Sequence, residues 1–158
     1  MRKMNWAEYQ KYDNSAKEWF TEIIEKNTKY KQHTGLNEEL YKEGDISFKY
    51  DDRILLFELE VRHAFDDIVY KYNTIHIPIR KVNTPSDFYV VIKPDFQQFI
   101  LIDSKLIQKN KDKIVTVRCE KEKNCDTPYI EDFVDIKKED TLWYIVIKDK
   151  KLTKVKYF

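Results

Sequence analysis

The sequence predicts an α+β domain in which an N-terminal helix packs against a mixed β-sheet. Apolar residues recur at helical spacing near the N-terminus, the pattern changes to alternation after Gly44, and strand-forming residues dominate the remainder. With 158 residues, of which 42% are hydrophobic and 15% aromatic, the chain can bury a core without disulfides or a structural metal. We therefore expect one domain, residues 1–158.

The first element is a helix from about residue 15. Ser15 and Glu18 have the spacing of a capping box, in which two side chains bond reciprocally to the backbone of a helix N-terminus. Glu18 and Glu22 are four residues apart and share one face of this helix. An apolar stripe lies beside that face and consists of Trp19, Phe20, Ile23 and Ile24.

The remainder of the chain is predicted to be mainly strands. Short segments rich in Ile, Val, Phe and Tyr alternate with turn residues, and helical signals are confined to residues 104–109 and 129–133. The predicted strands are residues 45–50, 53–62, 74–79, 87–93, 98–103, 113–119, 142–148 and 152–157.

The segment 44–62 carries the most informative pattern. A tight turn at Asp51 and Asp52 places Asp45 opposite Glu58 in an antiparallel hairpin. Side chains alternate between the two faces of a strand, so the hairpin has one apolar face and one polar face. The apolar face holds Ile46, Phe48, Tyr50, Leu55, Phe57, Leu59 and Val61, and the polar face holds Asp45, Ser47, Lys49, Glu58, Glu60 and Arg62.

Three acidic side chains on one polar face suggest a cation site. Cross-strand carboxylates lie about 5 Å apart and destabilise the pair unless a positive charge compensates them. Mg²⁺ binds one or two carboxylates together with water and phosphate oxygens, and Asp45 and Glu58 supply such a set. The alternative is a solvated polar face whose acids are splayed apart or paired with Lys49 and Arg62.

The order of these motifs resembles the PD-(D/E)XK nuclease superfamily, which has the restriction-endonuclease-like fold. The resemblance covers residues 15–103 and runs from the Glu-bearing helix through Gly44-Asp45 to Glu58-Leu59-Glu60. It implies that Asp45 and Glu58 are metal ligands, and that Glu60 occupies the position usually held by Lys and acts as a base or further ligand. Glu22, or else Glu18, matches the acid that the family's first helix turns toward the metal.

The same resemblance implies an activity, partners and a role for the rest of the chain. The expected activity is Mg²⁺- or Mn²⁺-dependent hydrolysis of phosphodiester bonds in DNA, and many members of the superfamily act as homodimers. Residues 104–158 are then a C-terminal extension of the sheet. They hold 14 basic and 10 acidic side chains, so this part of the chain can face an anion or present a solvated lysine-rich surface.

The predicted strand 74–79 resembles the third core strand of the family's sheet, and a basic pair follows it. Lys81, or else Arg80, is expected to reach the scissile phosphate and to supply the positive charge that Glu60 cannot. The alternative is a strand that ends at Pro78 and is followed by two solvated basic residues.

The remaining chemical groups carry weaker predictions. His63 follows the acidic strand and is a candidate proton carrier, although a lone histidine is more often structural. Cys119 and Cys125 are expected to be free thiols, because their spacing matches neither a zinc site nor a disulfide framework. The sequence has neither a membrane-spanning apolar run nor a secretory signal pattern, which indicates a soluble cytoplasmic protein without a membrane partner.

Two further functions compete with the nuclease. The first is a catalytically inactive module of the same fold that binds nucleic acid or a partner protein, and the missing family lysine favours it. The second is an accessory protein whose acidic patch mimics DNA. A divalent-metal titration separates the first from the nuclease, because a nuclease of this type has to bind metal.

Overall fold

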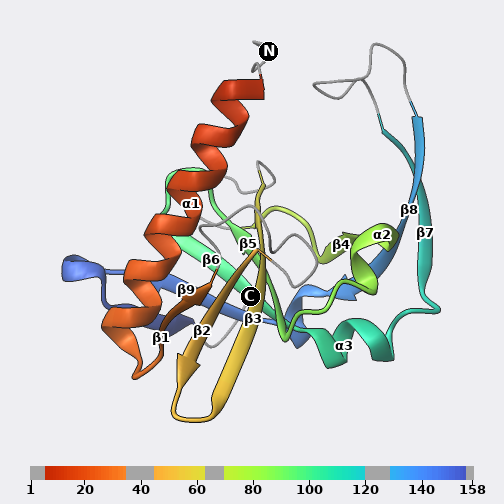
Figure 1. The fold of residues 1–158 in the computed structure, drawn as a ribbon. Helices are drawn as coiled ribbons and strands as arrows, with labels where there is room; N and C mark the ends of the chain where they lie inside the picture. The colour runs from red at the N-terminus through yellow and green to blue at the C-terminus, as the bar shows by residue number, and fades with distance from the viewer. Residues whose placement is uncertain (1–5, 35–44, 63–69, 120–128, 156–158) are drawn as a thin grey trace.

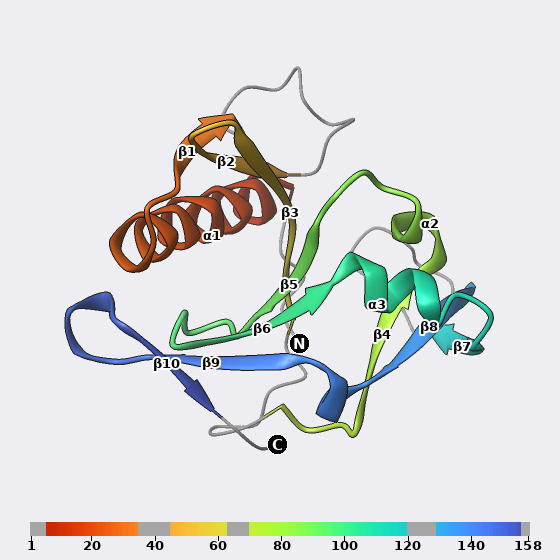
Figure 2. The same ribbon diagram turned by 90° about the horizontal axis from the view of Figure 1, so that it is seen from below.

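The protein has three layers. The computed structural model describes residues 6–34, 45–62, 70–119 and 129–155. A long helix, α1 (Trp6–Asn27), lies on the concave face of a curved seven-stranded sheet, and a three-stranded sheet lies on the opposite side (Figures 1 and 2). The predicted α+β class, with an N-terminal helix packed against a mixed sheet, is confirmed.

The larger sheet is mixed. Its strands run in the order β1-β2-β3-β5-β6-β9-β10, and the β3–β5 pair is parallel while its other neighbouring pairs are antiparallel. Its strands are β1 (Lys31–Thr34), β2 (Ile46–Tyr50), β3 (Arg53–Val61), β5 (Phe88–Ile92), β6 (Gln98–Asp103), β9 (Leu142–Val146) and β10 (Leu152–Val155).

The smaller sheet has the order β4-β8-β7. Three short helical elements, α2, α3 and the 3-10 turn η2, each connect a strand of the smaller sheet to a strand of the larger sheet. Another 3-10 turn, η3 (Lys148–Lys150), joins β9 to β10. The other bounds are β4 (Thr74–Pro78), α2 (Ile79–Val82), α3 (Ser104–Lys109), β7 (Ile114–Cys119), β8 (Tyr129–Lys137) and η2 (Lys138–Asp140).

The strand 74–79 was expected as the third strand of the main sheet, and this placement is wrong. The strand ends at Pro78, one residue before the predicted end, and it pairs with β8 in the smaller sheet. The C-terminal extension is divided in the same way, since β9 and β10 extend the larger sheet whereas β7 and β8 form the smaller one with β4.

Three local predictions also differ from the structure. Helix α1 begins at Trp6, so Ser15 lies inside the helix and does not cap it. Residues 129–133 belong to strand β8 and form no helical turn. Strand β1 was not predicted, because its four residues, Lys-Gln-His-Thr, show no apolar alternation.

The first core lies between α1 and the larger sheet. Phe20 is fully buried, and its ring packs edge-on against Phe48, Phe57 and Phe99 from three different strands. These contacts join the predicted apolar stripe of the helix to the predicted apolar face of the hairpin. Ring pairs of this kind stabilise a core beyond the area they bury.

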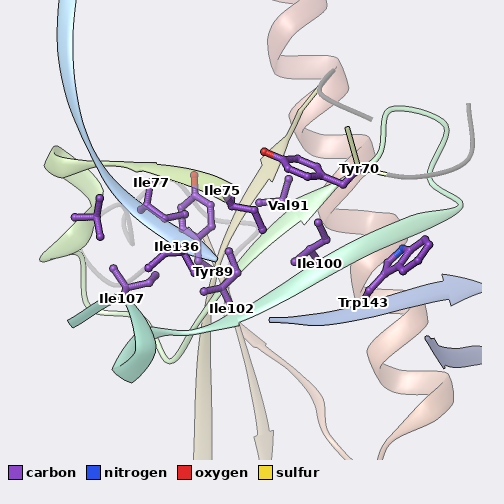
Figure 3. Close-up of a cluster of buried hydrophobic side chains, with 11 residues drawn as sticks. Tyr70, Ile75, Ile77, Tyr89, Val91, Ile100, Ile102, Ile107, Ile136 and Trp143 are labelled. Atoms are coloured by element: carbon purple, nitrogen blue, oxygen red, sulfur yellow. The ribbon is translucent and has the colours of Figure 1, made fainter. Parts of the chain in front are cut away.

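The second core lies between the two sheets. Figure 3 shows its side chains, which include Tyr89 and Ile100 from the larger sheet and Ile75 and Ile136 from the smaller one. Trp143 also belongs to this core, and its indole Nε1 donates to Gln98 Oε1 at 3.0 Å. Within the described residues, no helix combines the length and the apolar character needed to cross a membrane.

Candidate active site

The β2–β3 hairpin has the predicted register. The ladder pairs Ile46 with Phe57 at one end and Tyr50 with Arg53 beside the Asp51-Asp52 turn. This register turns one face of β3 toward α1 and places Glu58 and Glu60 on the other face, beside the second core. Glu58 is also the register partner of Tyr89 on the parallel strand β5.

Asp45 lies just before β2 and turns its carboxylate toward β3. Its backbone N–H donates to the carbonyl of Phe57 at 2.9 Å, and its Oδ2 accepts the N–H of Leu59 at 2.7 Å. The side chain thus occupies the place of a backbone acceptor at the end of the ladder. This bond holds the Asp45 carboxylate near Glu58, so the two are brought together as predicted.

The surroundings of Asp45 disfavour its charge. Burial and the negative charge of Glu58 raise the pKa of Asp45 from 3.8 to about 6. The bond from Leu59 and the positive charges of Lys81 and Lys17 oppose this rise without cancelling it. Asp45 and Glu58 are therefore a coupled carboxylate pair with incomplete compensation by positive charge.

Lys81 reaches this pair from α2. Its Nζ donates to Glu58 Oε1 at 2.7 Å and lies 5.8 Å from the ring centroid of Tyr89. Burial by itself lowers the pKa of Lys81, but the charges of Glu58, Glu60 and Asp45 outweigh burial and raise it. The ammonium group is therefore held in its charged form beside the two carboxylates.

Glu60 has a different partner. Both of its oxygens accept from Arg62, at 2.9 Å from the terminal nitrogen and 3.3 Å from Nε. Arg62 also donates to the carbonyl of His76 at 2.9 Å and is hydrogen-bonded with Tyr70, so it links β3 to the smaller sheet. Glu60 is thus in an ion pair, which is the alternative that the sequence left open for this residue.

Tyr70 is the residue whose place at the site the sequence did not predict, whereas Arg62 was expected on the polar face as an alternative partner of the acids. Burial alone lowers the pKa of Arg62, but the charge and hydrogen bonds of Glu60 outweigh burial and raise it. Burial raises the pKa of Tyr70. No spacing pattern relates Tyr70 to the hairpin, so its contact with Arg62 depends on how the chain returns between β3 and β4.

The other predicted site residues lie elsewhere. Glu22 is exposed on α1 and forms an ion pair with Lys150, and Glu18 is also exposed. Arg80 donates to Glu131 on β8 at 3.1 Å and is 67% exposed, so Lys81 is the member of the basic pair that contacts the carboxylates. His63 and Cys125 lie outside the described residues.

The donor set fits a metal ion that needs few protein ligands. Among the residues that the structure describes, no three His, Cys, Asp or Glu side chains are close enough to hold a metal ion together. The set that remains is the pair Asp45 and Glu58. Two carboxylates suffice for Mg²⁺, which keeps several water ligands, whereas a structural zinc site needs four protein ligands.

Comparisons of the chain with protein-family models, with curated proteins and with solved structures find no match in any of the three. The relation to PD-(D/E)XK nucleases therefore depends on the residues of the helix and the β2–β3 hairpin, and it stays a prediction.

The raised pKa of Asp45 predicts how stability depends on pH. The native state binds this proton more tightly than the unfolded state, so the free energy of unfolding falls as pH rises from 3.8 through about 6. Asp45→Asn keeps an acceptor for Leu59 but removes the charge. We expect it to stabilise the protein at pH 7.5 by on the order of 1–3 kcal/mol and to have little effect at pH 4.

Denaturant unfolding at both pH values measures this difference, with Asp112→Asn as the control because Asp112 is exposed in the turn after α3. Equal effects of Asp45→Asn at pH 4 and pH 7.5 would show that the carboxyl of Asp45 titrates normally.

Proposed function

We propose that the protein is a metal-dependent nuclease that hydrolyses phosphodiester bonds, with DNA as its substrate. The observation that carries this proposal is the contact of Lys81 with Glu58 beside Asp45. Two neighbouring carboxylates can hold a metal ion and one ammonium group can stabilise charge on a phosphate, and this chemistry uses both.

Asp45 and Glu58 would hold Mg²⁺ or Mn²⁺. Burial and the charge of Glu58 raise the pKa of Asp45, and a divalent cation would relieve the repulsion between the two carboxylates and favour the ionised carboxyl. Bound there, the ion would activate water and polarise the phosphate. Occupancy by metal is thus expected to stabilise the fold as well as to supply the chemistry.

Lys81 would stabilise the negative charge that develops on the phosphate. In the structure its ammonium is bound to Glu58, so a phosphate oxygen would have to share or replace that carboxylate as its acceptor. The group is buried on most sides, and such surroundings strengthen charge interactions. This role compensates for the family lysine that is absent at position 60.

Glu60 would take the proton of the attacking water or bind a second ion. Both roles require the bonds with Arg62 to open, because both oxygens of Glu60 accept from that guanidinium. If the bonds between Glu60 and Arg62 stay closed, Glu60 instead positions Arg62, which links β3 to the smaller sheet.

The ion pairs also support a second candidate, a catalytically inactive module that binds nucleic acid or a partner protein. Lys81 and Arg62 already compensate two of the three predicted acids, Glu58 and Glu60. A scaffold that needs no metal can use the same residues to hold its layers together.

Metal binding separates the two candidates. If the chain is a nuclease, titration calorimetry should detect Mn²⁺ binding, and Mn²⁺ should raise the melting temperature. Glu58→Gln and Asp45→Asn should weaken metal binding at least tenfold and abolish cleavage of plasmid DNA. Glu139→Gln, an exposed change in η2, is the matched control and should behave as wild type. DNA binding without metal binding or cleavage would favour the inactive module and contradict the nuclease.

The two basic neighbours give a sharper test of the chemistry. Lys81→Met should lower the cleavage rate by about 10²–10³-fold, because it removes a buried charge that stabilises the transition state. Arg80→Met should change the rate by less than about threefold, because Arg80 faces Glu131 and is largely solvated. Steady-state cleavage rates at saturating Mg²⁺ measure the effect of both variants. Equal losses of rate in Lys81→Met and Arg80→Met would show that Lys81 has no specific role in the mechanism.

A further inference from the structure

A second site lies on the other side of the larger sheet. An apolar cavity of about 430 Å³ lies where the C-terminal half of α1 meets the concave face of the sheet. Its volume is within the range of small-molecule pockets, which are about 300–1,000 Å³. The site is independent of the candidate nuclease residues, which act on the opposite face of β3.

Aromatic rings form most of the wall of this cavity. Phe57 stacks on Phe88 with ring centroids 5.3 Å apart, and Phe99 stacks on Tyr144 at 5.1 Å. Phe20 and Phe48 are fully buried beneath the cavity, and the accessible lining comes from half-buried residues such as Leu55, Phe88 and Tyr144. An occupant of this space is therefore apolar, either a hydrocarbon chain or a ring system.

The polar lining residues of the cavity, Asn27 and Thr28, lie at the end of α1 beside Leu152 of β10, and we take this edge as its mouth. Asn27 fixes this junction, because its Oδ1 accepts the N–H of Leu152 and its Nδ2 donates to the carbonyls of Ile23 and Lys150. The opening is thus held by specific hydrogen bonds between a helix and a strand that are more than 120 residues apart in the chain.

Positive charge dominates around this mouth. The segments 22–31 and 148–154 contain seven lysines against two glutamates and one aspartate, and Glu22 is already paired with Lys150. Lys29 and Lys151 are exposed and are the sequence neighbours of lining residues. The surroundings therefore complement an anion.

The negative potential at the C-terminal end of helix α1 is weakened by hydrogen bonds to its last carbonyl groups. The carbonyl oxygens of Ile23, Ile24 and Glu25 in its last turns accept side-chain bonds from Asn27, Thr28 and Lys31, respectively. Acceptors that are satisfied in this way present less negative potential to a neighbouring anion.

We propose that this cavity binds a free amphiphile with an apolar chain and a single anionic head group, such as a long-chain carboxylate. The chain lies among the aromatic rings, and the head group remains at the mouth beside Lys29 and Lys151. Both halves of the site contribute, because the lining is mainly apolar and holds no charged side chain, whereas the two lysines supply the positive charge.

Dodecanoate is the probe, used below its micelle concentration and titrated into the full chain by calorimetry. We expect saturable binding of one molecule. Butyrate, which has the head group without the chain, and dodecyltrimethylammonium, which has the chain with the opposite charge, should each bind at least tenfold more weakly. Equal binding of dodecanoate and dodecyltrimethylammonium would overturn the proposal, as would the absence of dodecanoate binding.

Two sets of variants locate the site. Leu152→Trp fills the mouth and should weaken dodecanoate binding at least tenfold, whereas Ile147→Trp, an exposed change that does not line the cavity, should not. The charge reversal Lys29→Glu with Lys151→Glu should weaken binding about fivefold or more, and Lys111→Glu, exposed after α3, is its control. The charge variants keep the test valid if Leu152→Trp unfolds. Unchanged affinity in them contradicts the proposal.

Other occupants give different results. If a second copy of the chain fills the cavity, sedimentation will show a concentration-dependent dimer that Leu152→Trp abolishes, and the amphiphile proposal is overturned. Asp45→Asn should bind dodecanoate as the wild type does, so failure of the nuclease proposal and failure of this one are distinguishable.

Discussion

The repulsion between Asp45 and Glu58 is the constraint on which the candidate site depends. The hairpin register brings both carboxylates to the same end of the β2–β3 ladder, and the Leu59 N–H holds one of them there. Burial strengthens the repulsion, and the charge of Lys81 compensates part of it. A fold that gathers like charges in this way loses stability at neutral pH, and a ligand of positive charge can recover that stability.

The two cores explain how the site stays in place. The larger sheet separates them, with aromatic rings against α1 on one side and branched aliphatic residues against the smaller sheet on the other. Strand β3 contributes to both layers, since Phe57 and Leu59 face the helix while Glu58 and Glu60 face the second core. The acids are therefore supported by a strand that is fixed on both faces. The smaller sheet adds α2, which carries Lys81 to Glu58.

Local patterns predicted much of this arrangement. The turn at Asp51-Asp52 is sufficient to set the hairpin register, and the alternation of its residues is sufficient to assign its faces. Lys81 was predicted to reach a phosphate, and the structure places it against Glu58, although the strand before it joins a different sheet from the one expected. Pairing between distant strands depends on the path of the whole chain, and short spacings carry no information about it. Strand β8 was missed because Glu131, Asp132 and Asp135 interrupt its apolar alternation. The partner of Glu60 was predicted only as one of two alternatives, since Lys49 and Arg62 share its face.

The most direct measurement of the central claim is a site-resolved ¹³C NMR titration of the Asp45 carboxyl, with and without Mg²⁺. The repulsion from Glu58 and the burial predict a midpoint near pH 6 without metal. They also predict a midpoint at least about one pH unit lower with Mg²⁺, because the cation favours the ionised carboxyl. A midpoint near 4 that Mg²⁺ leaves unchanged would show that the two carboxylates are neither coupled nor a cation site.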